Sequence, residues 1–443
     1  MKDITNVYKS IIRIHANNID YDMNNPQNKI IDFASIGSGF FINKNLIITC
    51  SHVVDKAETI TFTVPYISSN KYKLEIKAVC PNLDIAILKT VDYESEFWLN
   101  IDNSDNINIL EKAYIIGFPL GSDRIKLTTG IVSGAESGLI QTDSAVNSGN
   151  SGGPLLNENN KVIGIISSRI FLADGIGYAV PINSLLIFGI IKKYKYVYFP
   201  CNLLMDYCNS SIDRIESINN KNIKSGITIT KISKYSPLKE IGMESGDILY
   251  NFNGYNLDNY GNLTLLEDKN KIFNVLKIHD YIKKILPKHK YKISYYSFKN
   301  KEERTKQIYL NDSYNNGINN ILIPIFDKIK YINFGGLILL DITLNVMNSY
   351  TGYSIKRNNQ NYEKYENYIT VSNIEPKSEF NNSENITIGD IIIQLNDQKI
   401  SKLEDIIKFI KTDTNDYIDI KTYSNKIESI KKDKILKYLK YNF

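Results

Sequence analysis

The stretch that decides the fold is Asn147–Asn157, which reads NSGNSGGPLLN. Glycines at positions 149, 152 and 153 give the backbone the freedom for a tight turn, and such a turn can expose the hydroxyl of Ser151. A serine hydroxyl is inert near neutral pH unless a base takes its proton and preformed N–H donors bind the oxyanion that its attack creates. The stretch therefore predicts a nucleophile, and a nucleophile of this kind requires a histidine and a carboxylate elsewhere in the chain.

Among the four histidines, only His52 ends an apolar, β-branched run, which begins at Leu46. A second apolar segment, 37–42, precedes this run across the polar residues 43–45, and the pair predicts two strands joined by a short turn. Further along, Asp84 opens the apolar segment 84–88. The order His52, Asp84, Ser151 supplies a base, an orienting carboxylate and a nucleophile.

Each of these three residues also has a plain structural interpretation. A histidine after an apolar strand is often a core or surface residue. An aspartate at a strand start is often a turn residue, and an Asn-Ser-Gly-Gly turn can be an ordinary hairpin loop. Taken together and in this order, the three favour catalysis. A domain that keeps these residues but is inactive stays open as an alternative.

Several motifs in order resemble the trypsin-like protease domain of the HtrA/Deg family, over roughly residues 5–190. The motifs are GSGFFI at 37–42, TCSHVV at 49–54, DIAIL at 84–88, IIGFPLG at 115–121, TGIVS at 129–133, GNSGGPL at 149–155 and GIGYAVP at 175–181. The resemblance implies a mainly β protein whose protease domain is a chymotrypsin/trypsin-like double β-barrel. It implies that Ser151 attacks the peptide carbonyl, His52 transfers the proton and Asp84 orients the imidazole. The oxyanion hole would comprise the N–H groups of Gly149 and Ser151, with Asn150 between them.

Two positions bear on regulation and specificity. Asn150 replaces the aspartate that receives a freed N-terminal amine in digestive-type proteases, so activation by propeptide cleavage is not expected, and the resemblance implies regulation by loop ordering. Ala145 occupies the position of the pocket floor, and Ser167 and Ser168 are assigned to the same specificity pocket. Because none of these residues is charged, we expect a preference for small or medium aliphatic side chains.

A degenerate repeat follows the protease region, over residues 226–254 and 369–397. Each copy contains a strand, a Gly-Asp turn, a second strand and an Asn-containing hairpin turn. Helices are expected over Asn274–Leu286 and Lys402–Ile410. The pattern resembles PDZ domains, in which a helix and an edge strand capture an extended peptide.

The two PDZ-like copies differ in their candidate carboxylate-binding loops. In the second copy, Phe334, Gly335, Gly336 and Leu337 are candidates, because glycines let backbone N–H groups close on a peptide end. The corresponding segment of the first copy, 198–203, has no glycine and contains Pro200, which lacks an N–H. A protease followed by two divergent PDZ units resembles the plant-type Deg proteases, whose second unit serves oligomerisation.

We therefore expect three domains: a trypsin-like protease over 1–192, a first PDZ-like domain over 193–315 and a second over 316–443. A net charge of +5 across 53 basic and 48 acidic residues argues against a dedicated nucleic-acid binder. No apolar run is long enough for a signal peptide or a membrane span, so an intracellular, cytoplasmic location and no membrane partner are expected. The richness in Asn, Ile, Lys and Tyr indicates an AT-rich genome, such as that of a protist, a parasite or a large DNA virus.

The cysteines Cys50, Cys80, Cys201 and Cys208 show no metal-ligand spacing, and we expect buried thiols, no metal and no cofactor. Three functions remain open. The first is an ATP-independent serine endopeptidase that cuts unfolded or exposed protein segments in quality control and assembles as a homotrimer or a multiple of trimers. The second is a chaperone or scaffold with weak or absent proteolysis. The third is a processing protease dedicated to one partner, for instance viral or organellar.

Overall fold

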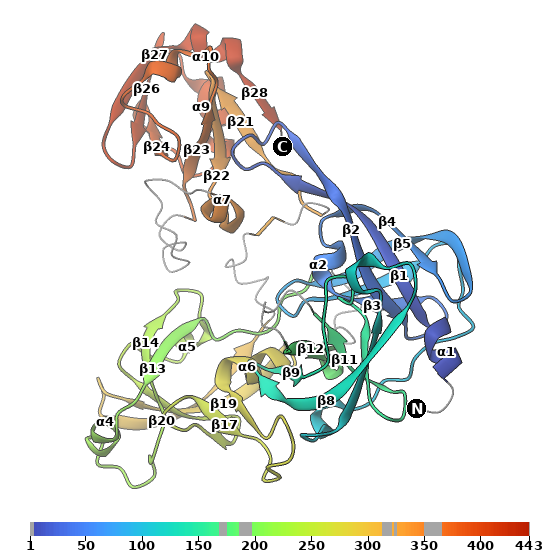
Figure 1. The fold of residues 1–443 in the computed structure, drawn as a ribbon. Coiled ribbons are helices and arrows are strands. Elements are labelled where there is room, and N and C mark those ends of the chain that lie inside the picture. Colours follow the sequence, from blue (N-terminus) through green and yellow to red (C-terminus); the bar gives the residue numbers. More distant parts are fainter. Residues whose placement is uncertain are drawn as a thin grey trace. The chain divides into compact units, whose positions relative to one another are not determined.

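The computed structural model describes residues 4–167, 175–185, 197–311, 321–322, 326–349 and 366–442. The chain forms two compact units (Figure 1). The first combines Met1–Asn18 with Phe33–Ile318, and the second combines Ile19–Asp32 with Asn319–Phe443. The expected division into domains at residues 192 and 315 stays a prediction. Among the described helices, none has the length and apolar content that a membrane span requires.

Two closed β-barrels make up the N-terminal part of the first unit, which confirms the expected double-barrel fold. The strand order of the first barrel is β1-β2-β3-β6-β5-β4, and that of the second is β10-β11-β12-β9-β8-β7. The strands of the first barrel are β1 (Ile11–Tyr21), β2 (Lys29–Phe41), β3 (Leu46–Thr49), β4 (Ala57–Val64), β5 (Ser68–Cys80) and β6 (Ile85–Thr90). Those of the second are β7 (Lys112–Gly117), β8 (Lys126–Glu136), β9 (Leu139–Thr142), β10 (Pro154–Leu156), β11 (Val162–Ile166) and β12 (Gly177–Pro181).

Short helices connect these strands: α1 (Ile4–Lys9), α2 (Ser51–Val54), η1 (Ser104–Asn106), η2 (Pro119–Gly121) and η3 (Ile182–Ser184). The apolar runs of the sequence become strands because their side chains fill the barrel interiors, as the complete burial of Ile47 and Ile48 on β3 illustrates. Strands β2 and β3 pair antiparallel through Phe40↔Ile48 and Phe41↔Ile47, which confirms the predicted hairpin across residues 43–45.

A further antiparallel sheet completes the first unit, with the order β13-β14-β15-β19-β20 and β16 paired to β15. Its strands are β13 (Met205–Asn209), β14 (Ile227–Ile232), β15 (Ile248–Phe252), β16 (Tyr255–Asn256), β19 (His289–Ser297) and β20 (Glu302–Leu310); β17 (Asn262–Thr264) and β18 (Val275–Lys277) form a separate pair. Its helices are α4 (Ile212–Glu216), α5 (Pro237–Glu240) and α6 (Ile278–Lys284). The helix predicted over Asn274–Leu286 is shorter than expected, because residues 275–277 pair with β17 instead of joining α6.

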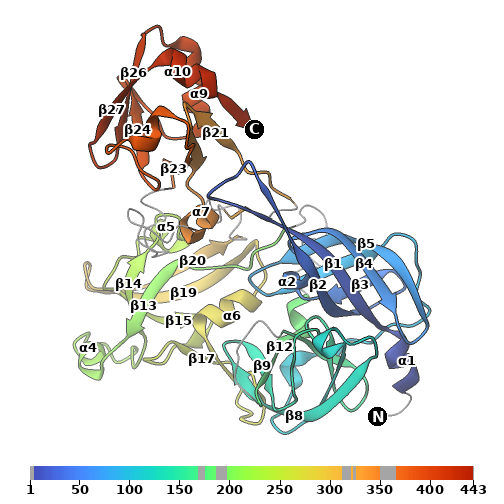
Figure 2. The same ribbon diagram turned by 45° about the horizontal axis from the view of Figure 1, so that its top comes forward.

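The segment between β17 and α6 packs against the second protease barrel. Ile272, Phe273 and Leu276 are buried in one apolar cluster with core residues of that barrel. A backbone hydrogen bond also joins the two, because the Ile109 N–H donates to Asn270 O at 3.0 Å. In both ribbon views α6 accordingly lies beside β9 (Figures 1 and 2). The sequence did not predict this contact, which ties the sheet that follows the protease to the barrel bearing the nucleophile turn.

The second unit is built on a sheet with the order β27-β26-β24-β23-β22-β21-β28 and β25 paired to β24. Its strands are β21 (Tyr331–Phe334), β22 (Leu337–Asp341), β23 (Ile369–Ile374), β24 (Ile391–Leu395), β25 (Gln398–Lys399), β26 (Tyr417–Thr422), β27 (Ile427–Lys431) and β28 (Lys440–Asn442). Its helices are α7 (Leu344–Ser349), η6 (Glu379–Asn382), α9 (Leu403–Thr412) and α10 (Lys432–Tyr438). Helix α9 confirms the helix predicted over Lys402–Ile410, with ends that differ by one or two residues.

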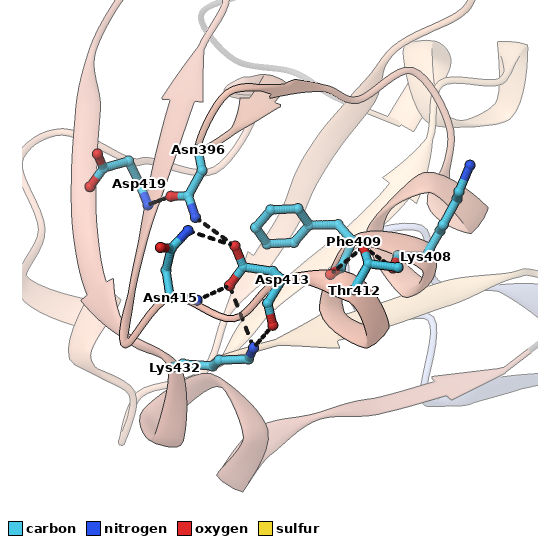
Figure 3. Close-up of polar contacts among 8 residues, drawn as sticks. All are labelled: Asn396, Lys408, Phe409, Thr412, Asp413, Asn415, Asp419 and Lys432. Atoms are coloured by element: carbon cyan, nitrogen blue, oxygen red, sulfur yellow. Dashed lines mark hydrogen bonds and ion pairs between the residues drawn. The ribbon is translucent and has the colours of Figure 1, made fainter.

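A polar cluster around Asp413 closes the end of α9 (Figure 3). Its carboxylate accepts hydrogen bonds from the side-chain amides of Asn396, at 3.1 Å, and Asn415, at 2.9 Å. Lys432 at the start of α10 donates to the Asp413 backbone carbonyl and forms an ion pair with its carboxylate at 3.4 Å. This single carboxylate therefore connects α9, α10 and the hairpin of β24, all within the second unit.

Candidate active site

His52 lies on α2, a single helical turn that begins directly after the buried strand β3. Its Nδ1 lies 2.8 Å from Asp84 Oδ2 and 2.9 Å from Asp84 Oδ1, and its backbone N–H donates to Asp84 Oδ1 at 3.0 Å. The imidazole side chain is 23% exposed, whereas that of Asp84 is 9% exposed. The structure thus joins two of the predicted residues in the arrangement that orients a catalytic imidazole.

Asp84 sits just before β6 with a left-handed backbone, at φ 55°. Aspartate tolerates this conformation better than most residues, which allows the side chain to turn back beneath His52. A third donor completes its surroundings, because Ser167 Oγ donates to Asp84 Oδ2 at 2.6 Å. Burial acts to raise the pKa of Asp84, but the hydrogen bonds from His52 and Ser167 outweigh burial and hold that pKa below its ordinary value.

Ser151 lies in the turn before β10 and is 3% exposed. The next residue, Gly152, has φ 85°, and a Cβ there would lie 2.1 Å from Thr49 Oγ1 and 3.0 Å from the Cys50 backbone nitrogen. Glycine is therefore required at this position, because the nucleophile turn packs closely against the two residues that precede α2. This close packing brings the turn that carries Ser151 against the segment that carries His52.

The oxyanion-hole candidates lie in the same turn. Gly149 has φ 93°, in the region that only glycine adopts freely, and a Cβ there would lie 2.2 Å from Phe118 O. Within the described residues its N–H donates no hydrogen bond. Asn150 is buried, with its N–H bonded to Asn147 O at 3.0 Å. The structure therefore leaves the Gly149 donor available and the Asn150 donor occupied.

The predicted specificity pocket receives less support from the geometry. Ala145 is exposed, while Ser167 is buried beneath Asp84 as described above. Ser168 lies outside the described residues. The preference for small or medium aliphatic side chains stays a prediction, whereas the contact of Ser167 with Asp84 gives this serine a place in the hydrogen-bond network of the site.

The candidate carboxylate-binding loop of the second unit is a tight hairpin. Phe334 and Leu337, paired across the β21–β22 turn, are fully buried. The Gly336 N–H already donates to Asn333 Oδ1 at 2.9 Å. Strand β22 is also paired on both sides, with β21 and with β23, so neither of its edges is open for an added peptide strand. Peptide capture at Phe334, Gly335, Gly336 and Leu337 therefore has no geometric support here and stays a prediction.

One group of potential metal ligands converges in the described part of the chain, and it overlaps the candidate active site: Cys50, His52 and Asp84, whose ligand atoms lie within 4.8 Å of one another. The Cys50 thiol is fully buried and donates to Ile166 O at 3.1 Å. Burial and the nearby Asp84 carboxylate raise the pKa of this thiol well above its ordinary value. A neutral thiol and a carboxylate already bonded to His52 and Ser167 make a poor donor set for a metal ion.

Two residues to which the sequence assigned no role contribute to the site: Cys50 lies next to Asp84, and Ser38 contacts the nucleophile turn. Ser167, predicted for the specificity pocket, instead donates a hydrogen bond to Asp84. Ser38 is the middle residue of the Gly37-Ser38-Gly39 motif. The two flanking glycines were the only feature of the sequence that pointed to close packing at Ser38. Because Ser38 and Ser151 lie far apart along the chain, only the packing of the two barrels shows that they are in contact.

The comparisons with known proteins agree with this geometry. A family model of the trypsin-like peptidase domain matches residues 37–165, and a PDZ domain model matches residues 341–418. The fold and these two matches indicate a trypsin-like peptidase domain and a PDZ domain. The chain is similar to Do-like, DegP and HtrA serine proteases, as its motifs predicted.

Two curated relatives illustrate the relationship. A putative Do-like 13 protease of Arabidopsis thaliana is 32% identical over 279 residues, which are 58% of this chain and 55% of that protein. The serine protease Do-like HtrA of Bacillus subtilis is 30% identical over 303 residues, covering 61% of this chain and 64% of the relative. This chain thus spans between half and two thirds of the length of these two relatives.

A solved structure extends the comparison to the fold. The HtrA-type protease AlgW with a tripeptide superposes with a TM-score of 0.53 at 20% identity, over 70% of this chain and 95% of that chain. At this identity the likeness supports the fold alone. The superposition with AlgW covers more of this chain than the trypsin-like peptidase model, which matches residues 37–165.

Proposed function

We propose that this chain is a serine endopeptidase that hydrolyses peptide bonds of proteins through an acyl-enzyme intermediate. The observation that carries the proposal is the pairing of His52 with the buried Asp84, with Ser151 on a glycine turn packed against the residues before His52. In this mechanism His52 takes the Ser151 proton during attack and delivers it to the leaving amine. Asp84 keeps the imidazole in the tautomer that can accept that proton.

Protein segments are the proposed substrates, and unfolded or exposed segments are favoured for quality control. Support comes from the names of the relatives, which include periplasmic serine endoproteases, and from the peptide bound to AlgW. Assembly as a homotrimer or a multiple of trimers is part of the proposal and rests on the resemblance to this family. Light scattering of the purified chain tests it, because a monomer at micromolar concentration would contradict trimer formation.

The decisive experiment is active-site labelling with a fluorescent fluorophosphonate. Wild-type protein is expected to form a covalent adduct, and Ser151→Ala is expected to form none, because the reagent reacts only with an activated serine hydroxyl. Ser144→Ala, which removes another buried serine hydroxyl of the second barrel, provides the matched control and should label normally. Failure of the wild type to label, even with added peptide or after mild heating, would overturn the proposal.

Casein hydrolysis separates the alternatives. The proposed enzyme degrades fluorescent casein in a manner that Ser151→Ala abolishes. Binding of unfolded casein without cleavage by the wild type would favour the chaperone or scaffold instead. Cleavage of one native protein at a single site, with casein spared, would favour the dedicated processing protease. The intracellular location stays a prediction that cell fractionation can test.

A further inference from the structure

The peptide group between Ser148 and Gly149 is held by the neighbouring turn, Phe118–Gly121. The Leu120 N–H donates to Ser148 O at 2.5 Å. In a trans peptide the C=O and the N–H point in opposite directions, so this bond directs the Gly149 N–H away from the turn. The orientation matters because a flipped peptide would present a carbonyl oxygen, and not a donor, to a developing oxyanion.

Ser38 anchors the adjoining peptide group to the same turn. Its hydroxyl is fully buried, donates to Gly149 O at 2.6 Å and accepts from the Phe118 N–H at 3.1 Å. Its backbone N–H also donates to Ser151 O at 2.8 Å. Ser38, a residue of the first barrel, therefore binds the carbonyls of Gly149 and Ser151 in the nucleophile turn. It also binds Phe118, the first residue of the turn that holds Ser148.

Arg13 anchors the other end of the turn. Its Nη2 donates to Gly121 O at 2.6 Å, and its Nη1 contacts Asp123 Oδ1 at 2.8 Å. The Arg13 side chain is only 15% exposed, whereas that of Asp123 is 91% exposed, so the bond to the Gly121 carbonyl is the better shielded of the two.

Packing holds only the start of the turn, where Phe118 is fully buried. Leu120 is in the left-handed region at φ 55°, an unfavourable conformation for leucine, and it is 82% exposed, so its side chain adds almost no packing. A strained, exposed turn persists only where its surroundings hold it. Beyond the buried Phe118 side chain and the bond from Leu120 to Ser148, the turn is held by its hydrogen bonds with Ser38 and Arg13 and by the bonds within the turn.

We propose that Ser38 and Arg13 are positioning residues for the oxyanion hole, which fix the Phe118–Gly121 turn and thereby keep the Gly149 N–H aimed at the substrate oxyanion. This inference rests on the proposed endopeptidase function. Neither residue touches the reacting atoms. Their removal should therefore lower transition-state stabilisation while leaving ground-state binding of substrate intact.

The test compares Ser38→Ala and Arg13→Ala with the wild-type chain, using fluorescent casein for kcat and KM and a fluorophosphonate for the rate of Ser151 labelling. Losing one oxyanion-hole donor costs on the order of 100- to 1,000-fold in kcat, and a disordered donor should approach that range. We expect kcat and the labelling rate to fall together, with KM within roughly two-fold of the wild type. Arg13→Lys, which keeps the charge and one donor, should restore part of the loss.

Ser10→Ala is the matched control for Ser38→Ala. Ser10 is also fully buried in the first unit, and its Oγ donates to Asn6 O at 2.8 Å, so its removal deletes a comparable hydrogen bond away from the turn. The kcat of Ser10→Ala should stay at the wild-type value. If Ser38→Ala fails to fold, the comparison of Arg13→Ala with Arg13→Lys decides the test. The inference would be overturned if the Ser38 and Arg13 variants kept the wild-type kcat and labelling rate, or if only KM changed. Absence of labelling in the wild type would instead overturn the proposed function itself.

Discussion

His52 and Asp84 are joined through two separate groups of the histidine: Nδ1 lies 2.8 Å from Asp84 Oδ2, and the backbone N–H of His52 donates to Asp84 Oδ1 at 3.0 Å. The carboxylate therefore orients the imidazole and also anchors the start of the short helix α2. Because Asp84 adopts φ 55° just before β6, this one contact ties the turn ahead of β6 to the helix after β3.

Replacing the carboxylate by an amide should abolish the proposed peptidase activity while leaving the protein folded. In Asp84→Asn the side chain is nearly isosteric, but its NH2 group can donate to His52 Nδ1 and favour the wrong tautomer. We expect kcat to fall about 10,000-fold, as it does when the same change is made in a serine-protease triad. Casein hydrolysis measures the loss, and circular dichroism checks the fold. A variant with wild-type kcat would show that Asp84 does not orient the base.

Ser167→Ala should destabilise the protein in a pH-dependent way. A hydrogen bond to a charged group contributes about 1.5–3 kcal/mol, so we expect a loss of that order near pH 7. Because the folded pKa of Asp84 is lowered, its stabilising effect is present above the ordinary carboxyl pKa and is lost as the pH falls through the folded value. The difference from the wild type should therefore shrink near pH 3.

Urea unfolding at the two pH values measures the Ser167→Ala effect. The control is Ser144→Ala, because Ser144 Oγ accepts from the neutral Thr142 hydroxyl at 3.0 Å, and that loss should not depend on pH. Equal losses for Ser167→Ala at pH 7 and pH 3 would contradict the assigned role of the hydrogen bond.

Lys284→Met should stabilise the first unit at neutral pH. Burial lowers the pKa of Lys284 to about 8, against the opposing influence of Asp105 and Asp280, and within the described residues its Nζ makes no hydrogen bond and lies 3.3 Å from the ring centre of Phe273. A lysine with a depressed pKa stabilises the fold only above its unfolded pKa and loses that stabilisation as the pH falls through 8. Removal of the amine should thus add about 1–3 kcal/mol at pH 7.

The gain from Lys284→Met should diminish as the pH is raised above 8, and thermal unfolding between pH 7 and pH 9.5 follows this trend. Lys44→Met provides the control, because Lys44 is 61% exposed in a surface ion pair with Glu94 and should change stability little. A neutral or destabilising Lys284→Met at pH 7 would show that the ion-pair partners outweigh the cost of burial.

Asp341→Asn should stabilise the second unit at pH 7. Burial raises the pKa of Asp341 to about 6, aided by Glu404 and Asp405 and opposed by the Leu403 N–H, which donates to Oδ1 at 3.0 Å, and by Lys330. A carboxyl group with a raised pKa stabilises the fold below its unfolded pKa and loses that effect as the pH rises through 6. Asparagine keeps the acceptor without the charge, so we expect a gain of about 1–3 kcal/mol at pH 7 and none below pH 4.

Hydrogen exchange of α9 reports this change, because the Leu403 N–H begins that helix. Asp405→Asn serves as the opposite case: burial acts to raise the pKa of Asp405, but its hydrogen bonds with Ser401 and Lys402 outweigh burial and lower that pKa. Its replacement should therefore destabilise α9 at pH 7. Protection of α9 that is unchanged in Asp341→Asn would contradict the prediction.

Local sequence was enough to select the candidate catalytic residues and the strands beside them. His52, Asp84 and Ser151 each stand at the edge of an apolar β-branched run or in a glycine turn, and these local patterns predict strand ends and turns. The helix expected over Asn274–Leu286 was too long, because pairing of residues 275–277 with β17 overrides local helix preference.

The sequence by itself determined the order of the three candidate catalytic residues and the glycine turn that carries Ser151, because these depend on short-range patterns of apolar, polar and glycine residues. The double-barrel class followed from the resemblance of several ordered motifs to a known family. Only the tertiary structure decided that Ser167 binds Asp84 and that Ser38 and Arg13 hold the turn beside Gly149. These contacts join residues from opposite barrels, separated by 83, 111 and 108 positions along the chain. A hydrogen bond between such distant residues leaves no local pattern, since its geometry exists only once both barrels have closed and packed.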